Sequence, residues 1–338
     1  MWSNIRPATT KAAGAVCAVA IDAEEDFDWL SPVYGTGYST GCMKNIRVLR
    51  DIFAAYGVVP TYLLTYPILE DAEVVSILSR QINRGECDVG IQLHPWVTPP
   101  FDDADKAASS FAGNLDPARE ELKVAELARK FTECFGRPPR IYRAGRYGLG
   151  EHTAGILERH GFTIDTSVAP HTNFTAEGGP DYSGYAYRPF WFGEHTGMLE
   201  LPLCRSIVGW SGRLAPAIYR ALSAPTFVSL RILTLLTRSR CAERITLSPE
   251  GNDLAAMIRL VNRLCASGHQ IFTLSFHSSS LAIGRNPYVQ TRAELHAFYD
   301  RLSGILDFMA THQSMRFASL AEIPALMQEP APPQAPVR

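Results

Sequence analysis

The sequence predicts an α/β fold built from parallel strands that are joined by crossover helices. Short apolar, β-branched runs alternate with segments whose apolar residues recur at helical spacing, and this alternation continues from about residue 15 to residue 320. Such a pattern is typical of either a βα barrel or a doubly wound sheet. Polar and charged residues stand just past the C-terminal ends of several strands, where a barrel builds its active site. We therefore favour the barrel.

The elements follow from local signals. The predicted strands cover residues 15–21, 58–66, 87–93, 140–144, 162–168, 198–203, 270–276 and 315–320. The predicted helices cover residues 42–57, 71–85, 116–136, 151–161, 253–268 and 291–312. In the helix at 116–136, Asp116 is the N-cap, Pro117 takes the first helical position and Gly136 ends the helix. The stretch 169–195 shows no period, so we expect it to be irregular.

The length of 338 residues allows one large domain or two ordinary ones. The continuous alternation favours a single barrel over residues 15–325, preceded by an extension at 1–14. A helical insert is expected near 210–245. The tail at 326–338 is rich in proline, and we expect it to be disordered.

Composition excludes several classes of protein. A net charge of −2 gives no electrostatic reason to expect a nucleic-acid partner. The seven cysteines are odd in number and contain no CxxC spacing, which argues against a disulfide framework or a thiolate zinc site. The N-terminal residues lack the pattern of a secretory signal peptide. These features predict a cytoplasmic protein.

One segment, 217–240, is apolar with interspersed arginines. It is broken at Pro225, and its uncharged stretch is too short to span a bilayer. Two interpretations remain open: a partly buried pair of helices, or a basic amphipathic helix on a membrane surface. The second would make the protein membrane-peripheral.

An acidic run follows the first predicted strand. Asp22, Glu24 and Asp26 share one face if the strand geometry continues, and their charges repel one another unless a cation or an arginine neutralises them. The run is therefore either a solvated acidic loop or a cation site.

Two histidines also stand at strand ends. His94 ends the strand at 87–93, with Gln92 two residues earlier on the same face, and His277 ends the strand at 270–276. A single histidine in such a place is more often structural than functional. In one barrel, however, both would converge with the acids at 22–26.

The strand at 140–144 adds basic and aromatic groups. Arg143 lies at its end, and Arg146 and Tyr147 follow in the loop. Acids, two imidazoles and an arginine thus stand at the ends of four separate strands.

The order of these motifs resembles the NodB-type polysaccharide deacetylases, carbohydrate esterase family 4, and most of all their WalW-like subgroup. The motifs read "IDAEEDFDW", "VGIQLHPWVTPPF", "YRAGRYG", "LELPL" and "LSFHSSSL", of which "LHPW" and "FHSSSL" are the most specific. The resemblance covers about residues 15–325. It implies a distorted (β/α) barrel of about seven parallel strands, a divalent metal that is usually zinc, and deacetylation of an acetamido sugar.

The resemblance also implies roles for individual residues. Asp22 matches the catalytic base, Arg143 matches the arginine that orients this base, and His277 matches the general acid. The metal would be held by His94 and by an acid after the base, either Glu24 or Asp26.

The chain departs from the family pattern in two places. Ala23 follows Asp22 where the family has a second aspartate, and Gln92 and Trp96 stand where the family has two histidines four residues apart. Gln92 and Trp96, together with Arg146 and Tyr147, are expected to contact the carbohydrate. The aromatic rings would stack on sugars, unless they are ordinary core residues.

Three hypotheses of function follow. The first is a metal-dependent deacetylase that acts on an acetamido sugar in an envelope or cell-surface polysaccharide pathway. The second is a catalytically inactive barrel that binds a glycan or a partner in lipopolysaccharide biosynthesis, for which Gln92 and Trp96 are the support. The third is an accessory protein at a membrane surface through 217–240, which is compatible with either of the others.

Overall fold

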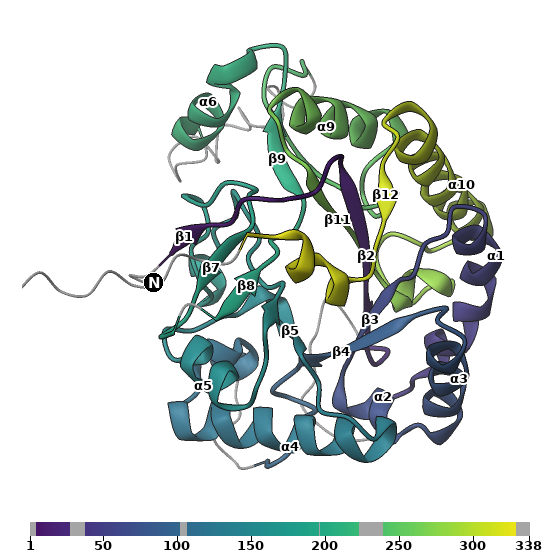
Figure 1. Ribbon diagram of the computed structural model, residues 1–338, viewed down its shortest axis with the longest axis vertical. Helices are drawn as coiled ribbons and strands as arrows, with labels where there is room; N and C mark the ends of the chain where they lie inside the picture. The colour runs from purple at the N-terminus through teal and green to yellow at the C-terminus, as the bar shows by residue number, and fades with distance from the viewer. Residues whose placement is uncertain (1–4, 28–37, 102–106, 196, 223–238, 329–338) are drawn as a thin grey trace, which may run out of the picture.

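A ten-stranded sheet runs through the centre of the computed structural model, and most helices lie around its outside (Figure 1). The structure describes residues 5–27, 38–101, 107–195, 197–222 and 239–328. The strand order is β1-β7-β8-β6-β5-β4-β3-β2-β11, and β12 pairs with β2 beside it. The ladders are parallel except for β1 with β7 and β7 with β8. The predicted α/β class with a mostly parallel sheet is confirmed.

The bounds of the elements are as follows. The strands of the large sheet are β1 Arg6–Pro7, β2 Val16–Ala23, β3 Thr61–Leu64, β4 Asp88–Leu93, β5 Ile141–Ala144, β6 Ile164–Asp165, β7 Phe190–Phe192, β8 Met198–Glu200, β11 Ile271–His277 and β12 Arg316–Phe317. A separate hairpin pairs β9 Arg205–Val208 with β10 Glu243–Thr246. The helices are α1 Leu49–Ala54, α2 Tyr66–Glu70, α3 Ala72–Asn83, α4 Pro117–Phe135, α5 Thr153–Arg159, α6 Ala215–Leu222, α9 Leu254–Ala266 and α10 Arg292–Asp307.

The sheet is covered on both faces. Along β2, Cys17, Val19 and Ile21 belong to the hydrophobic cluster that packs under the helices. The alternate residues Val16, Ala18 and Ala20 belong to a second cluster, which the C-terminal segment Leu320–Leu326 helps to close. Burial of both faces explains why this strand reads as a continuous apolar run rather than as an alternating one.

Strand register brings polar residues together at one end of the sheet. His277 stands directly opposite Asp22 in the β11–β2 ladder, and Gln92 stands opposite Arg143 in the β4–β5 ladder. Because parallel strands share the direction of their carboxyl ends, these side chains meet at the same edge.

Among the described residues, the strand ladder does not close into a continuous barrel. Backbone hydrogen bonds partly bridge the opening, from Leu247 N to Cys204 O at 2.7 Å and from Ser275 N to Leu247 O at 3.2 Å. The segments that follow β8 and β10 therefore connect the β8 side of the sheet to β11.

Four short strands were not predicted. β7 lies in the stretch 169–195 that was expected to be irregular, and β1 lies in the N-terminal extension. β9 and β10 lie at the two ends of the region expected as a helical insert, and α6 lies between them. Residues 223–238, the larger part of the segment considered for membrane contact, lie outside the described residues. No described helix is both long enough and apolar enough to cross a membrane.

Two described segments near the ends of the chain, residues 9–11 and 326–328, are joined by backbone hydrogen bonds. Gln328 N donates to Thr9 O at 2.8 Å, and Lys11 N donates to Leu326 O at 2.7 Å. Residues 326–328, expected to begin the disordered tail, thus bond to the N-terminal segment. Residues 329–338 lie outside the described part of the chain.

Close packing between β4 and β5 predicts a cost for adding one methyl group. A Cβ built on Gly90 would lie 2.7 Å from Ile141 Cβ and 2.8 Å from Ile141 O. We expect Gly90→Ala to lower the free energy of unfolding by roughly 1–3 kcal/mol in urea denaturation. Gly14→Ala is the control, because a Cβ there meets nothing within 4 Å. Equal stability of the two variants would contradict this packing.

Candidate active site

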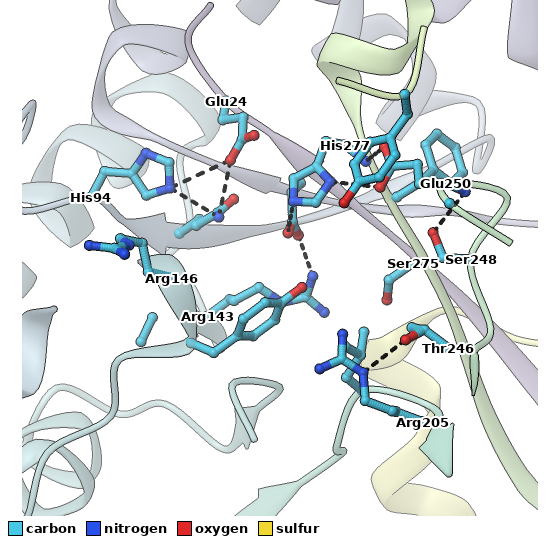
Figure 2. A pocket seen from close by; sticks show the side chains of 18 of the residues that line it. Glu24, His94, Arg143, Arg146, Arg205, Thr246, Ser248, Glu250, Ser275 and His277 are labelled. Atoms are coloured by element: carbon cyan, nitrogen blue, oxygen red, sulfur yellow. Dashed lines mark hydrogen bonds and ion pairs between the residues drawn. The ribbon is translucent and has the colours of Figure 1, made fainter. Parts of the chain in front are cut away.

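A cavity of about 760 Å³ opens at the carboxyl ends of the parallel strands (Figure 2). Nearly all the residues that the sequence singled out line it. They are Asp22, Glu24, Gln92, His94, Trp96, Arg143, Arg146, Tyr147 and His277. Asp26 is not among the lining residues; its carboxylate accepts a hydrogen bond from Ser39 Oγ at 2.7 Å.

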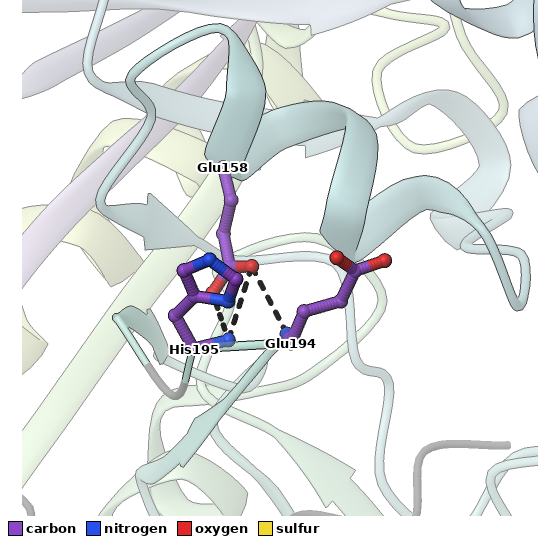
Figure 3. Close-up of side chains that lie close together, drawn as sticks. All are labelled: Glu158, Glu194 and His195. Atoms are coloured by element: carbon purple, nitrogen blue, oxygen red, sulfur yellow. Dashed lines mark hydrogen bonds between the residues drawn. The ribbon is translucent and has the colours of Figure 1, made fainter.

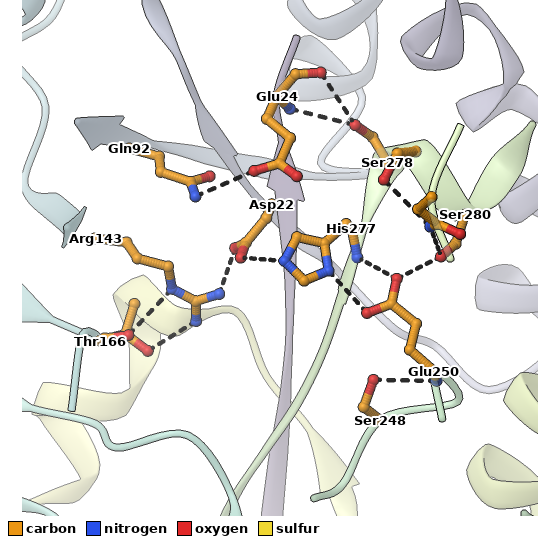
Figure 4. Close-up of polar contacts among 12 residues, drawn as sticks. Asp22, Glu24, Gln92, Arg143, Thr166, Ser248, Glu250, His277, Ser278 and Ser280 are labelled. Atoms are coloured by element: carbon orange, nitrogen blue, oxygen red, sulfur yellow. Dashed lines mark hydrogen bonds and ion pairs between the residues drawn. The ribbon is translucent and has the colours of Figure 1, made fainter. Parts of the chain in front are cut away.

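A buried ion pair joins Asp22 to Arg143 in this cavity (Figure 4). Asp22 is 2% exposed and Arg143 is fully buried. The guanidinium also donates through Nε to Thr166 O at 3.1 Å and through Nη2 to Thr166 Oγ1 at 3.0 Å. These bonds fix the plane of the guanidinium, so that it holds the Asp22 carboxylate in one orientation.

His277 approaches the other oxygen of the same carboxylate. Its Nε2 lies 3.5 Å from Asp22 Oδ2, and its Nδ1 lies 2.8 Å from Glu250 Oε2. Glu250 is held in turn by the backbone N–H of His277 at 2.9 Å and by the hydroxyl of Ser280. The imidazole therefore stands between two carboxylates, with Nε2 facing the cavity.

Glu250 was not found from the sequence. It lies in the "SPEGN" turn before α9, where an isolated acid among proline, glycine and serine gives no sign of its role. Burial lowers the pKa of His277, but the nearby carboxylates, Glu250 foremost, outweigh burial and raise that pKa to about 10. The imidazole is consequently protonated at neutral pH.

A second group of side chains surrounds Glu24. Gln92 Nε2 lies 3.4 Å from Glu24 Oε2 and 3.1 Å from His94 Nε2, and His94 Nε2 lies 3.5 Å from Glu24 Oε2. The three atoms thus form a nearly equilateral triangle at the cavity wall.

The orientation of His94 is fixed from behind. Its Nδ1 lies 2.8 Å from Glu25 Oε1, which also accepts a hydrogen bond from Trp96 Nε1 at 3.0 Å. The Trp96 ring stacks on the imidazole with 4.1 Å between centroids. Burial lowers the pKa of His94, but the surrounding carboxylates, Glu25 foremost, together raise it above its usual value. Burial raises the pKa of Glu25, but His94 and neighbouring hydrogen bonds together lower it below its usual value. The pair is thus mutually stabilised, and Nε2 is left to face Glu24.

Glu24 is the least compensated acid of the cavity. Burial raises the pKa of its carboxyl to about 8, although His277 and His94 act in the opposite direction. Its Oε1 and the side-chain oxygen of Gln92 are buried without a hydrogen-bond partner in the described chain. Such unpaired acceptor oxygens are the groups that a cation would satisfy.

The triangle fits a divalent cation. Ligands 2.0–2.2 Å from a tetrahedral ion stand roughly 3.3–3.6 Å from one another, close to the three separations observed. The orientation of a glutamine amide is inferred from its hydrogen bonds, and turning the Gln92 amide over would present its unpartnered oxygen to the ion. The Glu25–His94 contact is the carboxylate–histidine arrangement that commonly supports a metal ligand. Trp96 cannot act as a ligand, because its N–H is bound to Glu25.

A second histidine-and-acid cluster lies on the surface (Figure 3). Glu158, Glu194 and His195 bring possible ligand atoms within 4.8 Å of one another. The Glu158 carboxylate already accepts hydrogen bonds from the backbone N–H groups of Glu194 at 3.0 Å and His195 at 3.2 Å. Because these bonds tie a loop to α5, they account for the cluster without a metal.

Arg146 and Tyr147 form another wall of the cavity, and both have positive φ angles, 53° and 59°. Arg146 forms an ion pair with Glu177 and lies over the ring of Phe111, 4.2 Å from its centroid. The Tyr147 ring stacks on Phe174. This strained turn directs both side chains from the end of β5 toward the cavity.

Comparison with known proteins finds similar structures but no similar sequences. No family model matches the sequence, and no curated protein sequence matches it either. A proposed polysaccharide deacetylase from Mycobacterium smegmatis superposes with a TM-score of 0.53 at 16% identity, over 96% of this chain and 93% of that one. A proposed polysaccharide deacetylase from Pseudomonas aeruginosa gives a TM-score of 0.49 at 14% identity, over 91% and 89%. The fold is that of polysaccharide deacetylases.

The same fold occurs in another class of carbohydrate-active enzyme. The 4-alpha-glucanotransferase of Thermococcus litoralis matches with a TM-score of 0.54 at 9% identity, over 95% of this chain and 41% of that one. The function of the present chain must therefore be argued from its own site.

The buried ion pair predicts a large effect on stability. We expect Arg143→Gln to lower the free energy of unfolding by about 3–5 kcal/mol, because it leaves Asp22 buried without its counter-charge. The double variant Asp22→Asn, Arg143→Gln should recover part of this loss. Arg159→Gln is the control: its pair with Glu121 is largely exposed to solvent, and its loss should change stability far less than the loss of Arg143. If urea denaturation gave equal losses for the two single variants, the ion pair would not have this role.

Proposed function

We propose that the protein is a hydrolase that removes the acetyl group from an acetamido sugar. The observation that carries this proposal is the pairing of Asp22 with His277, 3.5 Å apart at one cavity, each held by its own partner. Amide hydrolysis needs a base that activates water and an acid that protonates the departing nitrogen. The fold shared with a polysaccharide deacetylase also supports this proposal.

Asp22 is the proposed base. Its ion pair with Arg143 fixes the orientation of the carboxylate, so that its second oxygen can accept a proton from a water molecule in the cavity. Because Arg143 is itself bound to Thr166 on the far side, the base cannot turn away from the cavity.

His277 is the proposed acid. The Glu250 carboxylate accepts a hydrogen bond from Nδ1–H and so favours the imidazolium, which can then give its Nε2 proton to the leaving amine. The acid and the base are thus oriented by different elements. β11 and the 248–252 turn position His277, and β2 and β5 position Asp22.

The cation of this site, which we propose to be zinc, would be held by Glu24, His94 and the side-chain oxygen of Gln92. When bound, it supplies a Lewis acid for the acetyl carbonyl and lowers the pKa of a bound water. We assign Trp96 to holding the His94 ring, since it is buried and stacked on that ring. Tyr147 is then the aromatic side chain best placed to contact the sugar.

We further propose the WalW-like subgroup, a pathway of envelope polysaccharide or lipopolysaccharide biosynthesis, and a cytoplasmic location. The motifs "LHPW" and "FHSSSL" support the subgroup. We also retain a single barrel domain over residues 15–325.

A second candidate function is glycan binding without catalysis. As oriented, the Gln92 amide donates to Glu24 Oε2 and lies 3.1 Å from His94 Nε2, so contacts within the protein hold the triangle together without a metal. Catalysis and simple binding differ in whether acetate is released.

The proposed activity predicts acetate release from N-acetylated chito-oligosaccharides by the zinc-supplemented protein. We expect Asp22→Asn and His277→Ala each to lower kcat by roughly 10²–10⁴-fold, because each removes one proton-transfer group. His94→Ala should abolish the response to zinc. Asp26→Asn is the matched control and should remain close to wild type, since Asp26 does not line the cavity. A folded, zinc-loaded protein that binds these sugars but releases no acetate would support the binding function instead.

The Glu250–His277 contact predicts a change in pH dependence. The acid must be protonated, so activity should fall as pH rises through the raised pKa of His277, about 10. Glu250→Gln removes the charge that most raises this pKa and should move the alkaline limb of kcat/KM to lower pH. Glu73→Gln, which lies in an exposed ion pair with Lys44, should leave that limb in place. An unmoved limb in Glu250→Gln would show that Glu250 does not tune the acid.

A further inference from the structure

Three arginine side chains gather in the segment between β8 and α9. Arg205 belongs to β9, Arg220 to α6 and Arg244 to β10, and Arg205 and Arg244 line the same cavity as the proposed catalytic groups. All three act on His171: burial first, and then the charges of Arg220, Arg244 and Arg205, lower the pKa of that imidazole to about 4. The region beside the cavity is therefore strongly positive.

Arg205 and Arg244 have no carboxylate partner among the described residues. Arg205 donates through Nε to Thr246 Oγ1 at 2.8 Å and also contacts the hydroxyl of Thr172 (Figure 2 shows the first of these). Arg244 donates to His171 O at 3.1 Å and lies 6.0 Å from the ring centroid of Tyr219.

The other cavity arginines are paired differently. Arg143 forms an ion pair with Asp22, and Arg146 forms one with Glu177. Residues 223–238 cannot supply the missing charge, because their sequence contains no aspartate or glutamate. Arg205 and Arg244 thus differ from Arg143 and Arg146 in having no carboxylate partner among the described residues.

The positive charges of Arg205 and Arg244 repel each other. Burial and the neighbouring Arg244 lower the pKa of Arg205 to about 10. Holding two guanidinium groups together in a partly desolvated cavity disfavours the folded state unless an anion compensates them. Hydroxyl and carbonyl acceptors satisfy some N–H donors but leave the charge uncompensated.

We propose that Arg205 and Arg244, with the exposed Arg220 nearby, bind an anionic group carried by the substrate glycan, either a phosphate or a carboxylate. The inference rests on the proposed function and names its substrate class. Guanidinium groups bind both anions through paired, charge-assisted hydrogen bonds. A neutral acetamido sugar carries no negative charge that would compensate these two guanidinium groups.

The cavity can hold both the acetamido group and the charged substituent of such a substrate. Tyr147 lines the same cavity as Asp22 and Arg205, and its ring centroid lies 6.0 Å from the guanidinium carbon of Arg143. A sugar that rests against Tyr147 can present its acetamido group to Asp22 and His277 while its charged substituent reaches Arg205 and Arg244.

The test compares three ligands by isothermal titration calorimetry: N-acetylglucosamine, N-acetylglucosamine 1-phosphate, and a disaccharide of glucuronic acid and N-acetylglucosamine. We expect at least one anionic ligand to bind about tenfold or more tightly than the neutral sugar, as a hydrogen bond to a charged group allows. A preference for the phosphate or for the uronate identifies the source of the charge.

Arg244→Gln should abolish this preference, and because Arg244 is exposed the substitution should leave the fold intact. Arg205→Gln should act in the same direction. Arg259→Gln is the matched control, because Arg259 pairs with Glu243 beside Arg244 but does not line this cavity. Its preference should equal that of the wild type.

Equal affinities for all three ligands, no binding of any of them, or a preference that persists in both variants would overturn the inference. Failure of the proposed function is a separate result. Anion-dependent binding without acetate release from any ligand would support the anion subsite and contradict the deacetylase activity. Acetate release that does not depend on the charge of the sugar would support the deacetylase activity and contradict the anion subsite.

Discussion

The buried contact between Asp22 and Arg143 constrains the shape of the whole sheet. These residues belong to β2 and β5, which are separated by β3 and β4 in the strand order. Three strand spacings in a flat sheet would place them roughly 14 Å apart, farther than an arginine side chain extends. The sheet must therefore curl at its carboxyl edge, and the ion pair stabilises that curvature. The same curl brings His277 of β11 and His94 after β4 to one cavity.

Charge balance organises this cavity. At the end of β2, Asp22 pairs with Arg143 and Glu25 with His94, whereas burial raises the pKa of the Glu24 carboxyl to about 8. On the side of the β9–β10 hairpin, Arg205 and Arg244 have no carboxylate partner among the described residues. The cavity thus holds a group of side chains that suits a metal ion and a group that suits an anion, together with Asp22 and His277, the proposed reactive pair.

The sequence predicted the long strands and most cavity residues because burial and strand-end position are local signals. It could not rank Glu24 against Asp26, since alternation holds only within a strand, and β2 ends at Ala23. Beyond that residue the chain turns, so Asp26 leaves the cavity and Glu25 reaches His94. Glu250 and the short strands β7, β9 and β10 depend on tertiary partners that no local pattern shows.

We propose that the strand ends form a hydrolytic site with a cation at Glu24, Gln92 and His94. Anomalous diffraction at the zinc absorption edge, from crystals grown with zinc, tests this proposal most directly. We expect one strong peak within bonding distance of Glu24, His94 Nε2 and the Gln92 side chain, with the Gln92 amide oxygen toward the ion. Density at Glu158, Glu194 and His195 alone, or no peak at the cavity in zinc-saturated crystals, would contradict it.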